Sequence, residues 1–287
     1  MIGRFAAAMM LLSAGDAAYR AEIERWREQA ERSLRADDGW LTVAGLFWLK
    51  EGVNRIGSGS GNEIELPAGS APARAGAIRF HAGQAELKIE RGVPAALNGK
   101  PVVSAVMRPD SAGRPDILTL GELSLFIIQR GDRFGVRLKD KNSRFRRNFT
   151  GRKWFPVKEE YRVTARFEPH AGPRQIAIPN VLGQIEKMAS PGRVVFQWKG
   201  REVSLGPVAS GERLWFIFRD RTSGKETYPA GRFLYSGAPR DGKVELDFNQ
   251  AYNPPCAFTP YATCPLPPRQ NWLPVRIEAG ELTYHTE

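Results

Sequence analysis

The sequence predicts a mainly β protein that carries one N-terminal helix. Apolar runs of strand length, bounded by turn residues, recur through most of the 287 residues, and 29 glycines and 21 prolines favour tight turns. Only one segment has a helical period, with apolar residues every third or fourth position and Glu and Arg between them. Its apolar face consists of Tyr19, Ile23, Trp26, Ala30 and Leu34. We therefore expect one amphipathic helix packed on β-structure.

Residues 1–18 have the pattern of a secretory signal peptide. A positively charged start precedes the apolar run Phe5 to Ser13, and small residues suitable for cleavage follow from Ala14 to Ala18. The alternative is an ordinary buried helix at the N-terminus. The run is too short to span a bilayer, and no later run is long enough. We expect a periplasmic or secreted protein without a membrane span.

The formal net charge of +11 favours anionic partners but does not by itself indicate which class of partner. The basic residues are spread along the chain and form no block longer than pairs such as Arg146-Arg147, so we expect no nucleic-acid partner. In an exported protein this charge favours attraction to anionic envelope surfaces. The simpler alternative is a basic, well-solvated surface.

After the helix, the chain divides into two groups of strands. Trp40 to Leu49 is an apolar run that fits either a strand or a short buried helix. Asn54 to Leu66 predicts a strand, a Gly-Ser turn and a second strand. The further strands expected in this group are Ala77 to Phe80, Ala85 to Glu90, Ala96 to Val102, Ile117 to Ile128 and Phe134 to Leu138.

A polar, basic hinge from Asp140 to Gly151 separates the second group from the first. Beyond it, strands alternate with turn signals at a spacing typical of an antiparallel barrel or sandwich. The sequence therefore predicts a helix and connector over 19–49, a β-sandwich over 50–140, and a C-terminal β-domain over 141–287.

The first group of strands resembles a forkhead-associated β-sandwich. In such domains a Gly-Arg turn, a Ser and His pair and an Asn-Gly turn surround a phosphothreonine. Gly57 and Asn98-Gly99 match, but Ser58 stands at the arginine position, no S-x-x-H follows, and the nearby histidine is His81. Without the arginine, phosphopeptide binding would lose its strongest charge-assisted contacts. The resemblance therefore implies the fold without that binding function.

Longer segments resemble the bacterial domain-of-unknown-function family numbered 1684. They are residues 38–58, Trp154 to Pro156, residues 218–234 and residues 246–281, and they extend over nearly the whole mature chain. The resemblance supports the unit as a whole and implies no activity.

The segment from Asp247 to Glu281 holds both cysteines and many prolines, so it can be neither a helix nor a central strand. Rigid loops of this kind often carry sites. Cys256 and Cys264 are expected to form a disulfide in an oxidising compartment, which would stabilise the fold by about 2.5 kcal/mol. The alternatives are a metal site or a reactive nucleophile. We expect no metal and no cofactor, because zinc needs four ligands and the 3 histidines are scattered.

Five polar or aromatic side chains near this segment are the candidate ligand-binding residues: Arg232, Asp247, Asn249, Tyr252 and Asn253. If the polar face of the strand at Asp247 lines the mouth of the β-domain, they converge as an acid, an anion anchor and a stacking platform. The alternative is a structural ion pair between Arg232 and Asp247, with both asparagines bonded to loop backbone.

The sequence therefore favours a binding or accessory module for a small or envelope-derived ligand. The alternative is a hydrolase that uses Asp247 together with Tyr252 or His170, and a third possibility is a purely structural envelope protein. The sequence contains no nucleophile elbow, phosphate-binding loop or zinc-protease helix motif.

Overall fold

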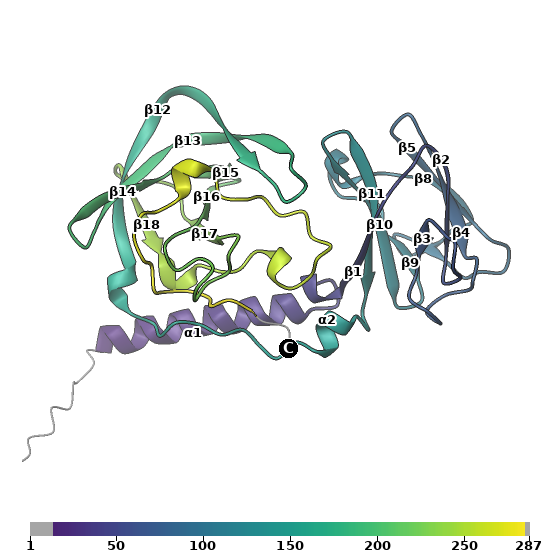
Figure 1. The fold of residues 1–287 in the computed structure, drawn as a ribbon, viewed down its shortest axis with the longest axis horizontal. Helices are drawn as coiled ribbons and strands as arrows, with labels where there is room; N and C mark the ends of the chain where they lie inside the picture. Colours follow the sequence, from purple (N-terminus) through teal and green to yellow (C-terminus); the bar gives the residue numbers. More distant parts are fainter. Residues whose placement is uncertain (1–13, 285–287) are drawn as a thin grey trace, which may run out of the picture.

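The computed structural model describes residues 14–284, which form a long helix, a β-sandwich and a larger β-domain (Figure 1). The predicted mainly β fold class with an N-terminal helix is confirmed. Residues 1–13, the greater part of the predicted signal peptide, lie outside the described residues. Within residues 14–284, no helix is both long and apolar enough to cross a membrane.

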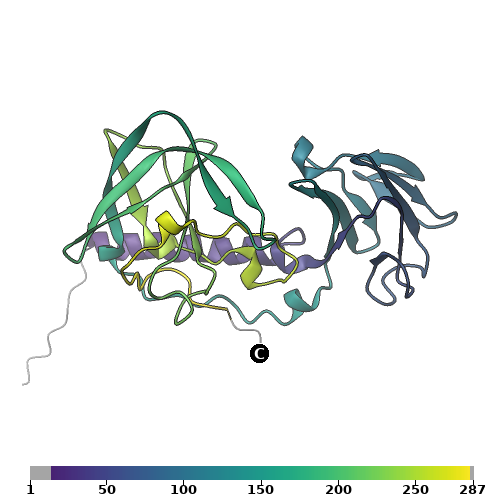
Figure 2. The ribbon, with the colours of Figure 1, turned by 45° about the horizontal axis from the view of Figure 1, so that its top comes forward.

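Helix α1 (Ala14–Arg35) runs along one side of the C-terminal β-domain (Figures 1 and 2). The predicted apolar face is the buried one: Ile23 is fully buried, and Tyr19 and Leu34 are each 7% exposed. Burial of these side chains, rather than helix propensity, is what holds such a helix in place. The expected apolar run at residues 40–49 consists of a short 3-10 helix (Trp40–Thr42) and the first strand of the sandwich.

The β-sandwich packs a five-stranded sheet (β3-β2-β4-β5-β8) on a six-stranded sheet (β1-β11-β10-β9-β6-β7) around one apolar core. The two sheets pack together because each buries the apolar face of its strands. In strand β5, for example, Ala85, Leu87 and Ile89 point inward while the residues between them are exposed. The strands are β1 (Val43–Trp48), β2 (Gly52–Gly57), β3 (Ile64–Glu65), β4 (Gly76–His81), β5 (Gln84–Ile89), β6 (Ala96–Leu97), β7 (Lys100–Pro101), β8 (Ser104–Met107), β9 (Leu118–Leu120), β10 (Leu123–Arg130) and β11 (Arg133–Asp140). The sandwich thus starts at Val43, before the boundary at residue 50 that we expected from the sequence.

The polar hinge contains a single-turn helix, α2 (Arg144–Arg147), between the two β-domains. Ser143 caps it by accepting a 3.2 Å hydrogen bond from the backbone N of Phe145.

The C-terminal β-domain consists of two antiparallel sheets, β14-β13-β12-β18 and β15-β16-β17, that share one apolar core. Its longest strands, β12 and β13, form the arch at the top of Figure 1. The bounds are β12 (Arg162–Pro179), β13 (Ile185–Trp198), β14 (Arg201–Leu205), β15 (Val208–Ser210), β16 (Arg213–Phe218), β17 (Arg232–Ser236) and β18 (Lys243–Asp247).

After β18, residues 248–284 form an irregular segment that we call the C-terminal strap. It contains only short 3-10 turns and crosses the domain from sheet to sheet, as the proline content predicts. Isolated bridges tie it down, among them Phe233 to Tyr252 and Trp154 to Glu281. Phe258 of the strap and Leu34 of helix α1 lie in one buried apolar cluster.

Candidate functional site

An aromatic pocket of about 400 Å³ lies between helix α1, strands β16 and β17, and the C-terminal strap. This volume is within the range of pockets that bind small molecules, and its walls have the mostly apolar character of such pockets. Its lining residues are Trp26, Ala30, Ser33, Leu34, Trp40, Arg152, Trp215, Phe233, Tyr235, Tyr252, Asn253, Pro255 and Phe258.

Strand alternation places two of the rings on the pocket wall. In β17, Phe233 and Tyr235 face the pocket, while Leu234 faces the apolar core on the other side of the sheet. Trp215 of β16 packs on Phe233 with 4.9 Å between ring centroids. Tyr252 joins this wall because the strap pairs with β17: the backbone N of Phe233 donates to the carbonyl of Tyr252 at 2.8 Å.

Helix α1 closes the pocket from the opposite side. The ring of Trp26 lies 6.3 Å from that of Tyr252 between centroids, and Tyr235 stacks on Tyr252 at 6.5 Å with an interplanar angle of 14°. Burial raises the pKa of Tyr252, so its hydroxyl stays protonated and can donate a hydrogen bond. The walls therefore offer flat apolar surface with a few polar groups.

Asn253 supplies the most informative polar atom of the pocket. Its side chain is only 2% exposed, its Nδ2 donates to the carbonyl of Leu282 at 2.8 Å, and its backbone N donates to Glu281 Oε2 at 2.7 Å. Its Oδ1 is buried and has no hydrogen-bond partner among the described residues. The indole Nε1 of Trp215 is also buried without a partner, although Trp215 borders a second cleft as well. A buried polar group without a partner costs free energy, so such atoms mark places where a ligand can bind.

Arg152 reaches the pocket as half of a buried ion pair. Its side chain is 4% exposed and that of Glu281 is 1% exposed, and Arg152 Nε donates to Glu281 Oε1 at 2.9 Å. A second bond joins Arg152 Nη2 to Glu281 Oε2, which makes the pair bidentate. Burial raises the pKa of Glu281, and the neighbouring Arg152 opposes this shift. The pair adds no net charge to the pocket when both groups are ionised.

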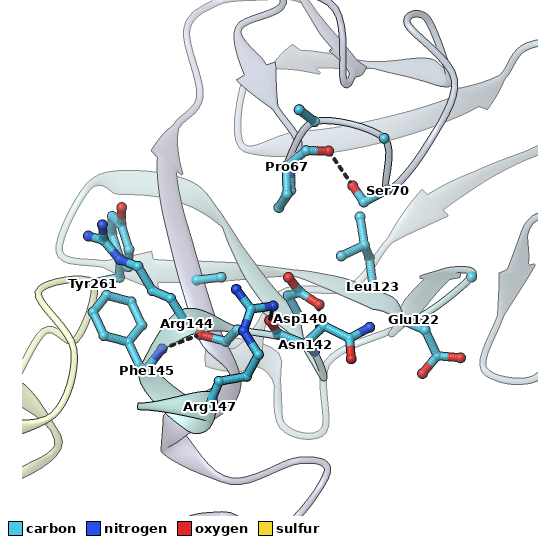
Figure 3. A pocket seen from close by; sticks show the side chains of 15 residues that line it. Pro67, Ser70, Glu122, Leu123, Asp140, Asn142, Arg144, Phe145, Arg147 and Tyr261 are labelled. Atoms are coloured by element: carbon cyan, nitrogen blue, oxygen red, sulfur yellow. Dashed lines mark hydrogen bonds between the residues drawn. The ribbon is translucent and has the colours of Figure 1, made fainter. Parts of the chain in front are cut away.

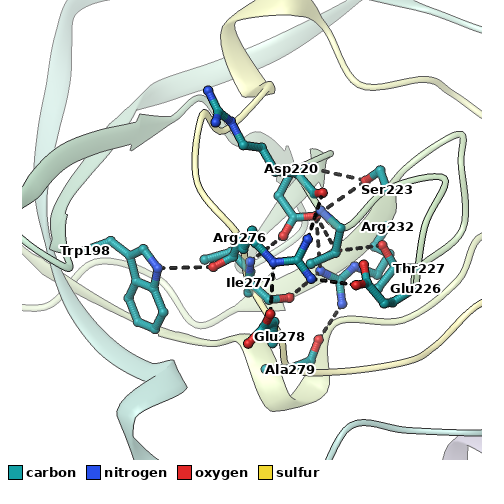
Figure 4. A network of polar contacts seen from close by, with 12 residues as sticks. Trp198, Asp220, Ser223, Glu226, Thr227, Arg232, Arg276, Ile277, Glu278 and Ala279 are labelled. Atoms are coloured by element: carbon teal, nitrogen blue, oxygen red, sulfur yellow. Dashed lines mark hydrogen bonds and ion pairs between the residues drawn. The ribbon is translucent and has the colours of Figure 1, made fainter.

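Arg232, one of the predicted ligand residues, lies on the core side of β17 and holds the strap (Figure 4). It is 1% exposed and donates from Nη1 to the carbonyl of Ala279 and from Nη2 to that of Ile277, the latter at 3.1 Å. Its acidic neighbour is Asp220, with 3.6 Å between Nη2 and Oδ1. The structure therefore brings Arg232 to Asp220 and the strap backbone, not to Asp247.

Asp247 and Asn249 lie together where helix α1 meets the end of β18. The hydroxyl of Tyr19 donates to Asp247 Oδ2 at 2.8 Å, and both the backbone N and the Nδ2 of Asn249 donate to Asp247 Oδ1 at 3.0 Å. Burial raises the pKa of Asp247. Within residues 14–284, no hydrogen bond joins Asp247 to Tyr252 or His170. The five candidates thus separate into Arg232 at the strap, Asp247 with Asn249 at the helix, and Tyr252 with Asn253 in the pocket.

The expected disulfide between Cys256 and Cys264 is absent from the structure, in which both residues are free thiols. The thiols are nevertheless neighbours, because the backbone N of Cys256 donates to Cys264 Sγ at 3.2 Å. Among the described residues, no group of three or more His, Cys, Asp or Glu side chains is arranged to hold a metal ion.

The sequence reasoning missed most of the aromatic walls, including Trp26, Trp40, Trp215, Phe233 and Tyr235. The alternation of Phe233 and Tyr235 was a local signal that both share one face of a strand. No local signal places that face opposite Trp26, because the two segments are far apart in the sequence.

Two further clefts lie between the β-domains. In the first, of about 700 Å³, Arg144, Phe145 and Arg147 of α2 face Pro67 and Ser70 of the sandwich (Figure 3). The second, of about 810 Å³, contains the ion pair between Arg130 and Asp110, at 2.8 Å. Both combine basic and acidic side chains on open surfaces, and neither has the aromatic walls of the pocket under α1.

Residues 147–282, which include most of the strap and most of the pocket, match the family model described as "Protein of unknown function (DUF1684)". An uncharacterized protein of Haloarcula marismortui, solved by NMR, is 30% identical over 48% of this chain and 79% of that chain, with a TM-score of 0.41. The FHA-2 domain of an ABC transporter of Mycobacterium tuberculosis is 23% identical over 33% of this chain and 80% of that chain, with a TM-score of 0.26. The FHA domain of FhaA is 20% identical over 33% of this chain and 97% of that chain, with a TM-score of 0.24. No curated protein matches the chain.

Proposed function

We propose that this chain, whose residues 147–282 match the DUF1684 family of unknown function, is an exported binding module for a small, planar ligand. The ligand occupies the aromatic pocket between helix α1 and the C-terminal strap. The proposal of export rests on the signal-like pattern of residues 1–18. In that compartment we expect the ligand to derive from the cell envelope.

The observation that carries the proposal is the buried Oδ1 of Asn253, which has no hydrogen-bond partner within residues 14–284 and lies in an aromatic pocket. The two donor nitrogens of Asn253 are already used within the protein, because Nδ2 donates to Leu282 and the backbone N donates to Glu281. A ligand that brings an N–H or O–H group to Oδ1 removes the cost of leaving this acceptor unpaired. The stacked and edge-on rings of Tyr235, Tyr252 and Trp26 favour a flat apolar body on that ligand.

The polar groups also define what the pocket excludes. Arg152 is neutralised by Glu281 at 2.9 Å, so the pocket has no free charge to balance a strongly ionic ligand. The ligand class is therefore an uncharged aromatic or heteroaromatic molecule with at least one hydrogen-bond donor.

The hydrolase alternative receives less support from the geometry. Both carboxylate oxygens of Asp247 already accept hydrogen bonds, Oδ2 from Tyr19 and Oδ1 from Asn249, at 2.8 Å and 3.0 Å. Asp247 does not line the aromatic pocket. A general acid or base must reach the group whose proton it moves, and these contacts direct Asp247 toward helix α1 instead.

We do not extend phosphothreonine binding to the sandwich. The hydroxyl of Ser58 donates to the carbonyl of Ala71 at 2.5 Å, and Asn98 Nδ2 donates to Asp116 Oδ1 at 2.7 Å. A carboxylate at this position repels a phosphate group, and the arginine that would attract it is missing.

Ligand-observed NMR with indole as a probe tests the proposal. Indole is flat and apolar and has one N–H donor, whereas benzothiophene has nearly the same shape without the donor. We expect saturation transfer from the protein to indole, and weaker transfer to benzothiophene. Equal transfer to the two probes would contradict the role of Asn253, and no transfer to either would contradict an aromatic-ligand pocket.

A filled pocket provides the matched control. Ala30 lines the pocket from helix α1, so Ala30→Trp should occupy the ligand volume and abolish the indole signal. Arg25→Trp places the same ring on the exposed face of that helix and should leave binding unchanged. Unfolding curves of both variants would confirm that each is folded before binding is compared.

A further inference from the structure

A buried arginine that forms no salt bridge among the described residues lies near the two cysteines, at the boundary between the β-domains. Arg137 of β11 in the sandwich is 4% exposed, and its Nε is buried with no hydrogen-bond partner in the part of the chain that the structure describes. Its Nη2 donates at 3.3 Å to Oγ1 of Thr263 in the strap. Thr263 directly precedes Cys264 in the sequence. Within residues 14–284, Arg137 forms no salt bridge. Burying an unpaired charge is costly, so this guanidinium calls for a negative partner.

The neighbouring Arg130 shows what is unusual about Arg137. Arg130 Nε also donates to Thr263 Oγ1, at 3.0 Å, but its charge is balanced by Asp110 at 2.8 Å. The hydroxyl of Tyr228 also reaches the cysteine loop and donates to the carbonyl of Cys256 at 3.1 Å. Asp110 also favours the charged form of Arg137 but is already paired with Arg130, so the thiols of Cys256 and Cys264 are the nearby groups that can supply further negative charge.

We propose that Cys256 and Cys264 are a reversible dithiol–disulfide couple that exchanges with low-molecular-weight disulfides, with Arg137 as counter-ion of its reduced form. The two thiols are already neighbours, with Cys264 Sγ accepting from the backbone N of Cys256 at 3.2 Å. Cys256 is half-buried and Cys264 is 5% exposed, so an external disulfide meets Cys256 first. This proposal is independent of the ligand pocket.

The electrostatics assign different parts to the two thiols. The hydrogen bond from Cys264, together with Arg137, lowers the pKa of Cys256. The pKa of Cys264 is raised, first because its thiol hydrogen-bonds to Cys256 and second because it is buried. Burial, and the nearby charge of Arg130, lower the pKa of Arg137 to about 10, which still leaves it charged near neutral pH. Because Cys256 is also the more exposed of the two thiols, it is the thiolate nucleophile and Cys264 the thiol that resolves the mixed disulfide.

The exchange balances in two steps. The Cys256 thiolate attacks one sulfur of a disulfide R–S–S–R, so that a Cys256–S–S–R bond forms and one R–S⁻ leaves. Cys264 then loses its proton to the solvent or to that leaving thiolate, attacks the Cys256 sulfur, and expels the second R–S⁻. Two protein thiols are oxidised to one disulfide, and one external disulfide is reduced to two thiols.

The test measures the dithiol–disulfide equilibrium in mixtures of reduced and oxidised glutathione. The full chain is equilibrated, quenched with acid, alkylated, and analysed by mass spectrometry for the intramolecular disulfide. Because Arg137 stabilises the thiolate of the reduced form, Arg137→Met should shift the equilibrium about tenfold toward the disulfide, or about 30 mV toward more negative potential. Arg55→Met is the control and should not shift it, because Arg55 is an exposed arginine of the same sandwich that pairs with Glu63 at 2.9 Å.

A second measurement keeps the proposal testable if Arg137→Met does not fold. In the unmodified protein, the rate of alkylation of Cys256 should have its pH midpoint below about 8.5, the value of an ordinary thiol. A mixed glutathione disulfide that persists on Cys256, no intramolecular disulfide at any ratio, or an ordinary pH midpoint would each overturn the proposal. An equilibrium unchanged in a folded Arg137→Met variant would overturn it as well.

Discussion

The hydroxyl of Tyr19 donates a 2.8 Å hydrogen bond to Oδ2 of Asp247, joining the first helix to the last strand across 228 positions. Asn249 completes the contact, because its Nδ2 donates both to Tyr19 Oη and to Asp247 Oδ1. These polar groups fasten the start of helix α1, and the same helix carries Trp26 and Ala30 to the aromatic pocket. The contact therefore helps to shape the pocket without lining it.

Removing this hydroxyl should loosen the helix. Tyr19→Phe leaves Asp247 Oδ2 and Asn249 Nδ2 each with one partner fewer, which should lower the free energy of unfolding by about 1–3 kcal/mol. Urea unfolding followed by tryptophan fluorescence measures the change. Tyr261→Phe is the control, since no side-chain hydrogen bond of Tyr261 occurs among the described residues, and an equal loss in the two variants would contradict this role for Tyr19.

Asp247 should also leave a signature in the pH dependence of stability. Burial raises its pKa in the folded state above the ordinary value of 3.8, so between these two values the folded protein binds more protons than the unfolded chain. The contribution of Asp247 to stability is therefore largest below 3.8 and falls as pH rises through the folded-state pKa. The side chain in Asp247→Asn cannot titrate. As pH rises through this window, the variant should therefore become more stable relative to the unmodified protein. Urea unfolding at several pH values checks the sign, and a difference that is constant with pH would contradict the raised pKa.

The buried pair of Arg152 and Glu281 should be far more sensitive than a pair on the surface. Glu281→Gln leaves a buried guanidinium without its counter-ion and should cost about 3–5 kcal/mol of stability. The double variant Arg152→Met, Glu281→Leu removes both charges and should recover much of that loss. The exposed pair of Arg162 and Glu245, at 2.8 Å, is the control, and Glu245→Gln should cost no more than about 1 kcal/mol. Chemical denaturation would refute this ranking if the two single variants lost equal stability.

Local periodicity explains why the secondary structure could be predicted. Tyr19, Ile23 and Leu34 are buried at helical spacing, and Ala85, Leu87 and Ile89 are buried at strand spacing. The period fixes which residues share a face, and burial then follows from their apolar character.

The partners of polar residues have no such local signature. In β17 the sequence suggested that Arg232 faces an open site, but Arg232 shares the core face with Leu234. There it pairs with Asp220 and donates hydrogen bonds to strap carbonyls. Phe233 and Tyr235 line the pocket on the other face. A charged residue inside a core and aromatic residues around a pocket reverse the usual assignment. Of the five residues proposed from the sequence, Tyr252 and Asn253 line the pocket, and the rings that surround them were not among the five.

Gly280 links the two parts of the strap that meet Arg232 and Arg152, and its backbone conformation should not tolerate a side chain. Its φ is +78°, and a Cβ there would lie 2.5 Å from the carbonyl oxygen of Ala251 and 2.7 Å from that of Phe248. Gly280→Ala should therefore cost about 2–4 kcal/mol, from the left-handed backbone together with the overlap. It should also weaken indole binding, because the neighbouring Glu281 holds the backbone of Asn253 at 2.7 Å.

Gly242 is the matched control for Gly280. Its φ is +70°, but a Cβ there would have no atom within 4 Å, so Gly242→Ala carries only the conformational cost of about 1 kcal/mol. Urea unfolding of both variants separates the backbone term from the overlap term. If both glycines cost the same, the close approach of Gly280 to Ala251 and Phe248 is not what fixes the strap, and the position of Asn253 must depend on the Arg152–Glu281 pair instead.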